Sequence, residues 1–142
     1  IKTDTNINIL IAKSLIKKGF KKIGVLGLSY KGNLKVDILS PVIPFIKYLK
    51  SKGITVSLFD PYYSIKEIKK IAGVKSFKYP QDLNKFDCIV VSIDHKEFKT
   101  KMKSITKYLS NCKYILDNMK VWEKINFPKR ITYKISGEKN WI

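Results

Sequence analysis

The chain has 142 residues, a formal net charge of +18, 44% hydrophobic residues and 12% aromatic residues. This length fits one domain of ordinary size, and the hydrophobic content excludes a wholly disordered chain. No apolar run is long enough for a membrane helix, no secretory signal is recognisable, and the first residue is Ile rather than Met, so we expect a fragment of a longer protein.

The positive charge is spread over nearly all segments of the chain. Arg130 is the only arginine, and every other cation is a lysine. Proteins that read bases and phosphates rely on the planar, bidentate arginine fork. We therefore expect no specific nucleic-acid partner, and only salt-sensitive adsorption to polyanions.

Two cysteines, Cys88 and Cys112, lie far apart in the sequence and match no metal-binding spacing. Cys88 belongs to the apolar run 88–91, which favours a buried, inert thiol. Both cysteines are consistent with a reducing cytoplasm, and no metal site is expected.

Apolar periodicity and turn residues predict alternating helices and strands. The run 23–28 is continuously apolar, as is typical of a buried parallel strand, and 88–93 is the clearest central strand. In chain order we expect a helix at 7–18, a strand at 23–28, a helix at 40–52, a strand at 54–59, a short helix at 65–71, a short strand or extended link at 77–79, a helical turn at 80–84, a strand at 88–93, a helix from Asp94 to about Leu109, and strands at 114–116 and 131–135.

This alternation predicts an α/β fold: a doubly wound, Rossmann-like, mainly parallel sheet with helices on both faces. Ligands of such sheets bind beyond the carboxyl ends of the strands. If 23–28 and 88–93 are the central strands, Lys31 and Asp94 follow them at the same edge.

The turn 30–33 directly follows the first strand and places a cation and an aromatic ring at that edge. The Lys31 ammonium suits an anionic oxygen such as a phosphate, and the Tyr30 ring suits stacking or packing. The alternative is a surface lysine in a lysine-rich chain, but the position at a strand end favours a binding role.

His95 is the only histidine, and it follows the strand at 88–93. An acid–base role is conceivable, because histidine is the side chain that titrates near neutrality. We favour the alternative in which Asp94 caps the following helix and His95 packs in the turn. Trp122 and Trp141 are core residues or interface anchors, and the sequence leaves both open.

Four segments together carry a resemblance to a known family. They are 26–33 with Ser40-Pro41 behind it, 59–62, 91–98 and 116–118. In this order and spacing they closely resemble the C-terminal, nucleotide-sugar-binding domain of the UDP-glucose/GDP-mannose dehydrogenase family. The resemblance covers nearly the whole chain.

The resemblance implies an NAD-dependent 6-dehydrogenase of polysaccharide biosynthesis, acting on UDP-glucose or UDP-N-acetyl-D-mannosamine. Such enzymes oxidise the C6 alcohol of the sugar to a carboxylate through a catalytic cysteine. Residues 1–20 resemble the helix that connects from a missing upstream domain, and residues 21–142 resemble the C-terminal domain. NAD would be bound mainly by the missing N-terminal domain, so we expect the fragment to be inactive alone.

By the same resemblance, Lys31 matches a lysine that contacts the nucleotide sugar, and Tyr30 matches the aromatic residue beside it. Ile38 occupies the position where the family has an arginine that faces the cofactor. Met119 occupies the position where the family has an arginine that helps to hold the nucleotide sugar. We therefore expect weak UDP-sugar binding through Tyr30 and Lys31, and we assign no catalytic or cofactor-binding residue.

The implied partners are a UDP-sugar and the missing N-terminal and central domains, with a homodimer of the full protein left open. The expected location is the cytoplasm, without a membrane contact. The first alternative is a non-catalytic nucleotide-sugar-binding or dimer-stabilising remnant of the fold. The second is a basic module that binds polyanions.

Overall fold

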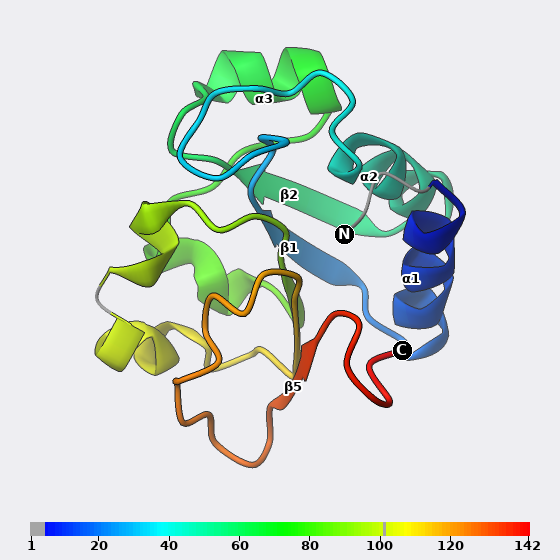
Figure 1. The fold of residues 1–142 in the computed structure, drawn as a ribbon. Helices are drawn as coiled ribbons and strands as arrows, with labels where there is room; N and C mark the ends of the chain where they lie inside the picture. Colours follow the sequence, from blue (N-terminus) through cyan, green and yellow to red (C-terminus); the bar gives the residue numbers. More distant parts are fainter. Residues whose placement is uncertain (1–4, 101) are drawn as a thin grey trace.

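A computed structural model describes residues 5–100 and 102–142 as a five-stranded sheet with helices against it (Figure 1). The strand order is β2-β1-β3-β4-β5, and all four pairings are parallel. The strands are β1 (Lys22–Leu26), β2 (Thr55–Phe59), β3 (Cys88–Val91), β4 (Tyr114–Asp117) and β5 (Thr132–Ile135). The predicted α/β class is confirmed.

The described residues also form three α-helices and three short 3-10 helices, of which α1 precedes the first strand and the others lie between strands. They are α1 (Thr5–Lys17), α2 (Val42–Ser51), α3 (Ile65–Ala72), η1 (Gln81–Lys85), η2 (Lys96–Lys99) and η3 (Met102–Tyr108). In the described part of the chain, none of these helices has the length and apolarity that crossing a bilayer requires.

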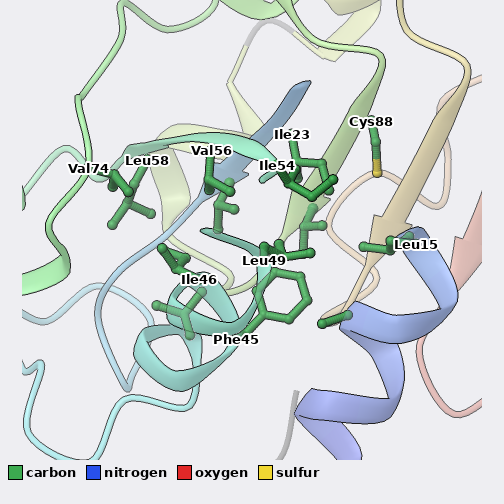
Figure 2. Close-up of a cluster of buried hydrophobic side chains, with 14 of the residues drawn as sticks. Leu15, Ile23, Phe45, Ile46, Leu49, Ile54, Val56, Leu58, Val74 and Cys88 are labelled. Carbon is green, nitrogen blue, oxygen red and sulfur yellow. The ribbon is translucent and has the colours of Figure 1, made fainter. Parts of the chain in front are cut away.

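Buried side chains form one hydrophobic cluster on each face of the sheet. On the first face, Leu15 of α1 and Phe45 and Leu49 of α2 pack against Ile23 and Val56 of the strands (Figure 2). The α-helices all contribute to this cluster. The second face is covered by the 3-10 helices and the loops after β3 and β4, whose buried residues include Leu83, Phe98, Ile105 and Trp122.

The prediction of one helix from Asp94 to about Leu109 is wrong. Residue 101 within this range lies outside the described residues. Two 3-10 helices, η2 and η3, take its place, and Thr100 between them is extended. The residue at the N-cap of η2 is His95, not Asp94, and the His95 side chain makes no capping hydrogen bond to this helix. A physical reason is visible in the sequence, since lysines at 96, 99 and 103 would repel along one helix face.

The segment predicted as a short strand or extended link at 77–79 forms no strand. A single bridge between Ser57 and Lys75 marks its approach to β2. The remaining strands and helices start or end within a few residues of their predicted bounds. Residues 1–4 of the expected connecting segment 1–20 lie outside the described residues.

The loops after β1 and β3 meet at the carboxyl edge of the sheet. These strands pair directly, with Leu26 beside Val91 at their ends. A side chain at Gly32 would collide with the Asp94 carboxylate, so the two loops are in contact. The expectation that Lys31 and Asp94 share one edge is therefore confirmed.

Candidate functional site

The loop between β1 and α2, residues 27–41 and hereafter the Lys31 loop, folds back on itself into a compact turn. The Tyr30 amide donates to the Val36 carbonyl over 2.5 Å. The buried Ser29 hydroxyl accepts from the Val36 amide (3.2 Å) and lies 2.9 Å from the Lys31 carbonyl and 2.5 Å from the Leu34 carbonyl. These bonds shape the loop from inside, so the two predicted ligand residues stand on an ordered backbone.

Tyr30 and Lys31 both face solvent on this loop. The Tyr30 side chain is 42% exposed and Lys31 is exposed as well. The loop, cyan in Figure 1, also reaches α3, because the Lys35 ammonium lies 2.6 Å from the Glu67 carboxylate. A ring and an ammonium are thus presented together at the carboxyl edge, beside the ends of β1 and β3.

A fully buried carboxylate, Asp60, holds the start of this loop through hydrogen bonds to its backbone. Asp60 follows β2, and its Oδ2 accepts the amide protons of Leu28 (2.8 Å) and Ser29 (3.0 Å). Its Oδ1 accepts the amide proton of Tyr62 over 2.9 Å. Charge-assisted bonds of this kind are stronger than neutral ones, so Asp60 couples the end of β1 to the end of β2.

His95 is fully buried and bridges Asp60 to the far end of the loop. Its Nε2 lies 2.8 Å from Asp60 Oδ2, and its Nδ1 lies 2.9 Å from the amide nitrogen of Asn33. The ring packs edge-on against Tyr62, with centroids 4.6 Å apart. The interpretation that His95 packs in the turn therefore agrees with the structure, whereas the predicted Asp94 cap does not form.

Sequence reasoning missed the pairing of Asp60 with His95. The signal was present, because each residue follows a buried strand and both strands flank β1. What the sequence could not provide is the register that brings the two side chains within hydrogen-bond distance below the loop.

A second buried carboxylate, Asp117, organises the loop after β4. Its Oδ1 accepts the amide protons of Met119 (3.2 Å) and Val121 (3.0 Å). Its Oδ2 accepts from the Trp122 amide (2.8 Å) and the Tyr133 hydroxyl (2.5 Å). Burial, followed by this hydrogen bond to Asp117, raises the pKa of Tyr133 above its usual range.

The two positions where the family resemblance leads one to expect arginine carry exposed apolar side chains. Ile38, on the far arm of the Lys31 loop, is 72% exposed, and Met119, after β4, is 43% exposed. Neither side chain can donate a hydrogen bond to a phosphate. Of the three positions where the family resemblance leads one to expect a cation, 31, 38 and 119, only position 31 carries one in this sequence.

The two cysteines are poor nucleophiles in this fold. Both are fully buried, and burial raises the pKa of Cys88 well above its usual value and that of Cys112 to about 11. The thiolate is the reactive form, so neither thiol is activated near neutral pH. The described residues also contain no group of three or more side chains suited to hold a metal ion.

The described segment between β1 and α2 lacks the features that hold the pyrophosphate of a dinucleotide. Such a cradle needs a glycine-rich turn running from the first strand straight into the N-terminus of a helix. Here β1 ends at Leu26, and α2 starts only at Val42, after the closed Lys31 loop. These residues do not fit NAD at this strand end.

Comparison with known proteins identifies relatives along the whole chain. The sequence model of the UDP-glucose/GDP-mannose dehydrogenase family, UDP binding domain, matches residues 24–124. A UDP-N-acetyl-D-mannosamine dehydrogenase of Methanococcus aeolicus is 30% identical over 100% of this chain and 34% of its own length. One from Methanococcus vannielii is 34% identical over 84% of this chain and 28% of its own length. The chain thus spans about a third of the length of these curated relatives.

Solved structures give the same result for the fold. A UDP-N-acetyl-mannosamine dehydrogenase from S. aureus superposes with a TM-score of 0.69 at 22% identity, over 94% of this chain and 30% of its own. A UDP-D-ManNAc dehydrogenase from Pyrococcus horikoshii has a TM-score of 0.63 at 26% identity, over 92% of this chain and 29% of its own.

Proposed function

The chain belongs to the UDP-glucose/GDP-mannose dehydrogenase family, and from this premise we propose that it is the C-terminal, UDP-sugar-binding part of an NAD-dependent UDP-sugar 6-dehydrogenase. The parent enzyme would oxidise the C6 alcohol of the sugar to a carboxylate. Several relatives carry the name UDP-N-acetyl-D-mannosamine dehydrogenase, which favours that sugar over UDP-glucose.

The observation that carries the proposal is the placement of Tyr30 and Lys31. Both side chains are exposed on a hydrogen-bonded loop at the carboxyl end of β1. At β1 the strand order reverses, because β2 lies on one side of β1 and β3 on the other. In open parallel sheets, ligands bind in the crevice at this switch point. Lys31 would bind a phosphate oxygen of UDP, and Tyr30 would pack beside the nucleotide.

The rest of the reaction would be supplied by parts of the protein outside this chain. NAD and the catalytic cysteine would be bound or carried by N-terminal and central domains, because Cys88 and Cys112 are buried and no dinucleotide cradle follows β1. We therefore expect the isolated chain to be inactive. A cytoplasmic location and a homodimer of the full protein belong to the same proposal.

A non-catalytic, nucleotide-sugar-binding remnant is the second candidate. It is favoured by Ile38 and Met119, which replace two cationic contacts with exposed apolar side chains. The reading frame upstream separates the two candidates. A Gly-x-Gly-x-x-Gly strand–helix unit and a cysteine-bearing middle domain would support the enzyme, and their absence would support the remnant.

Binding of UDP to the isolated chain tests the role of Lys31. With one of three expected cations left, we expect a Kd of roughly 0.1–1 mM, equivalent to about 4–6 kcal/mol. Lys31→Ala should raise this Kd roughly tenfold or more, because a hydrogen bond to a charged group contributes about 1.5–3 kcal/mol. Isothermal titration calorimetry at constant ionic strength measures both values.

Lys113→Ala is the matched control. Lys113 is an exposed lysine directly before β4, at the opposite edge of the sheet, and its removal lowers the net charge equally. We expect a change in Kd of less than about twofold for this variant. Equal weakening in the two variants would mean that UDP adsorbs to the lysine-rich surface, and the proposed site would be lost.

A further inference from the structure

The two ends of the Lys31 loop are held by a single buried pair of side chains. Asp60 accepts the amide protons of Leu28 and Ser29, just before the ligand residues. His95 accepts the amide proton of Asn33, just after them. Because Asp60 and His95 also bond to each other, the segment 28–33 is clamped at both ends by one connected unit.

At the Asn33 end of the clamp, the Asn33 side chain makes a further hydrogen bond. Asn33 adopts a φ of 61°, a left-handed conformation that asparagine tolerates better than most residues. Its side-chain oxygen accepts the amide proton of Lys96 over 2.7 Å. Asn33 therefore joins the β1–α2 loop to the residues after β3, with His95 between them.

The partners of His95 fix the position of its proton. The Asn33 amide is a donor, so Nδ1 must present a lone pair to it. The Asp60 carboxylate oxygen is an acceptor, so Nε2 must carry the proton. Both ring nitrogens are used, and the residue is fully buried, so the clamp requires a neutral ring in the Nε2–H tautomer.

We propose that His95 is a positioning residue for nucleotide binding, which holds Tyr30 and Lys31 in place through the Asn33 amide as a neutral Nε2–H imidazole. This inference rests on the proposed function, because it assumes that UDP binds at Tyr30 and Lys31. His95 does not touch the ligand itself; it limits the freedom of the loop that does. A loop already ordered before binding loses less conformational entropy when the ligand arrives.

Two substitutions separate the two bonds of the ring. In His95→Asn, the side-chain oxygen takes the place of Nδ1 and keeps an acceptor for the Asn33 amide, while the bond to Asp60 is lost. In His95→Gln, the side-chain amide group takes the place of Nε2 and keeps a donor for Asp60, while the bond to Asn33 is lost. Both variants remove the ring that packs on Tyr62 and Phe98.

The Kd for UDP is the first measurement. His95→Gln should raise it about fivefold or more, because one buried hydrogen bond at the loop is lost, whereas His95→Asn should change it less than about twofold. A merely structural role predicts equal effects from these matched variants. Equal Kd values in the two variants would therefore overturn the positioning role.

Hydrogen exchange at the Asn33 amide tests the clamp without any ligand. Protection of this amide should persist in the unchanged chain and in His95→Asn, and it should be lost in His95→Gln. If UDP fails to bind while this pattern holds, the proposed function fails and the clamp stands. If the Asn33 amide is as well protected in His95→Gln as in the unchanged chain, the inference that His95 holds this amide is contradicted.

The ring nitrogen shifts of the unchanged chain provide a readout even if both variants fail to fold. With 15N-labelled histidine at neutral pH, Nε2 should have the shift of a protonated nitrogen and Nδ1 that of an unprotonated one. The opposite tautomer, or a doubly protonated ring, would contradict the inference.

Discussion

At the scale of single residues, two buried aspartates organise the carboxyl edge. Asp60 and Asp117 each stand at the end of a strand, and each accepts several backbone amide protons from the loops that follow or flank it. An aspartate in this position costs desolvation energy, which is offset when all its oxygens accept hydrogen bonds. Removing the acceptor would leave buried amides without partners.

Asp117→Asn should destabilise the fold by about 3 kcal/mol, because the new amide group cannot accept from the donors around it. Tyr133→Phe removes only the hydroxyl bond to Asp117 and should cost about 1 kcal/mol. Urea unfolding followed by circular dichroism gives both free energies. A loss from Asp117→Asn no larger than that from Tyr133→Phe would show that the backbone bonds to this carboxylate contribute little.

The place of Tyr30 and Lys31, the residues proposed to bind the ligand, could be predicted from the sequence, but the contacts that support their loop could not. The position of Tyr30 and Lys31 after a buried strand already indicated the carboxyl edge. The Asp60–His95 contact depends on a sheet register that joins residues 35 positions apart. Such non-local pairing leaves no periodic signal in a single sequence.

At the scale of elements, the segment after β3 shows where local patterns mislead. The buried residues Phe98, Ile105 and Leu109 are spaced as on one face of an α-helix, yet the chain forms the two 3-10 helices η2 and η3. The His95 side chain is held by Asp60 and Asn33, so the turn that starts the segment is fixed by tertiary contacts. Where the local signals are stronger, as in α3, prediction and structure agree.

The α3 helix combines a capped N-terminus with a contact to the Lys31 loop. Ser64 and Glu67 form a reciprocal capping box, and Gly73 ends the helix with a φ of 70°. Its Glu67 carboxylate also pairs with Lys35, which, together with the backbone bond from Ser64, lowers the pKa of Glu67. Since both partners are well exposed, the cap should matter more than the ion pair.

Ser64→Ala should therefore cost about 1 kcal/mol of stability, as is usual for the loss of an N-cap. Ser51→Ala is the control, because Ser51 is an exposed serine in the last turn of α2, where no N-cap is lost. Urea unfolding of the two variants measures the difference. Equal free energies for both would contradict the role given to the cap.

At the scale of the whole molecule, the proposed anion site at Lys31 would compete with a surface of net charge +18. Lys47, Lys50 and Lys70 line an open groove of about 530 Å³ between α2 and α3, and no residue of the Lys31 loop lines this groove. A phosphate ligand has an electrostatic reason to visit this groove too. Affinity alone is thus less informative than the place where the ligand binds.

The most direct test is to map UDP onto the 15N-labelled chain by NMR titration at about 0.15 M ionic strength, where exposed charges are screened beyond about 8 Å. We predict saturable shifts centred on residues 30–33, with smaller shifts at Tyr62 and His95, which lie below the loop. Shifts centred on Lys47, Lys50 and Lys70 that disappear as salt is added would contradict the account.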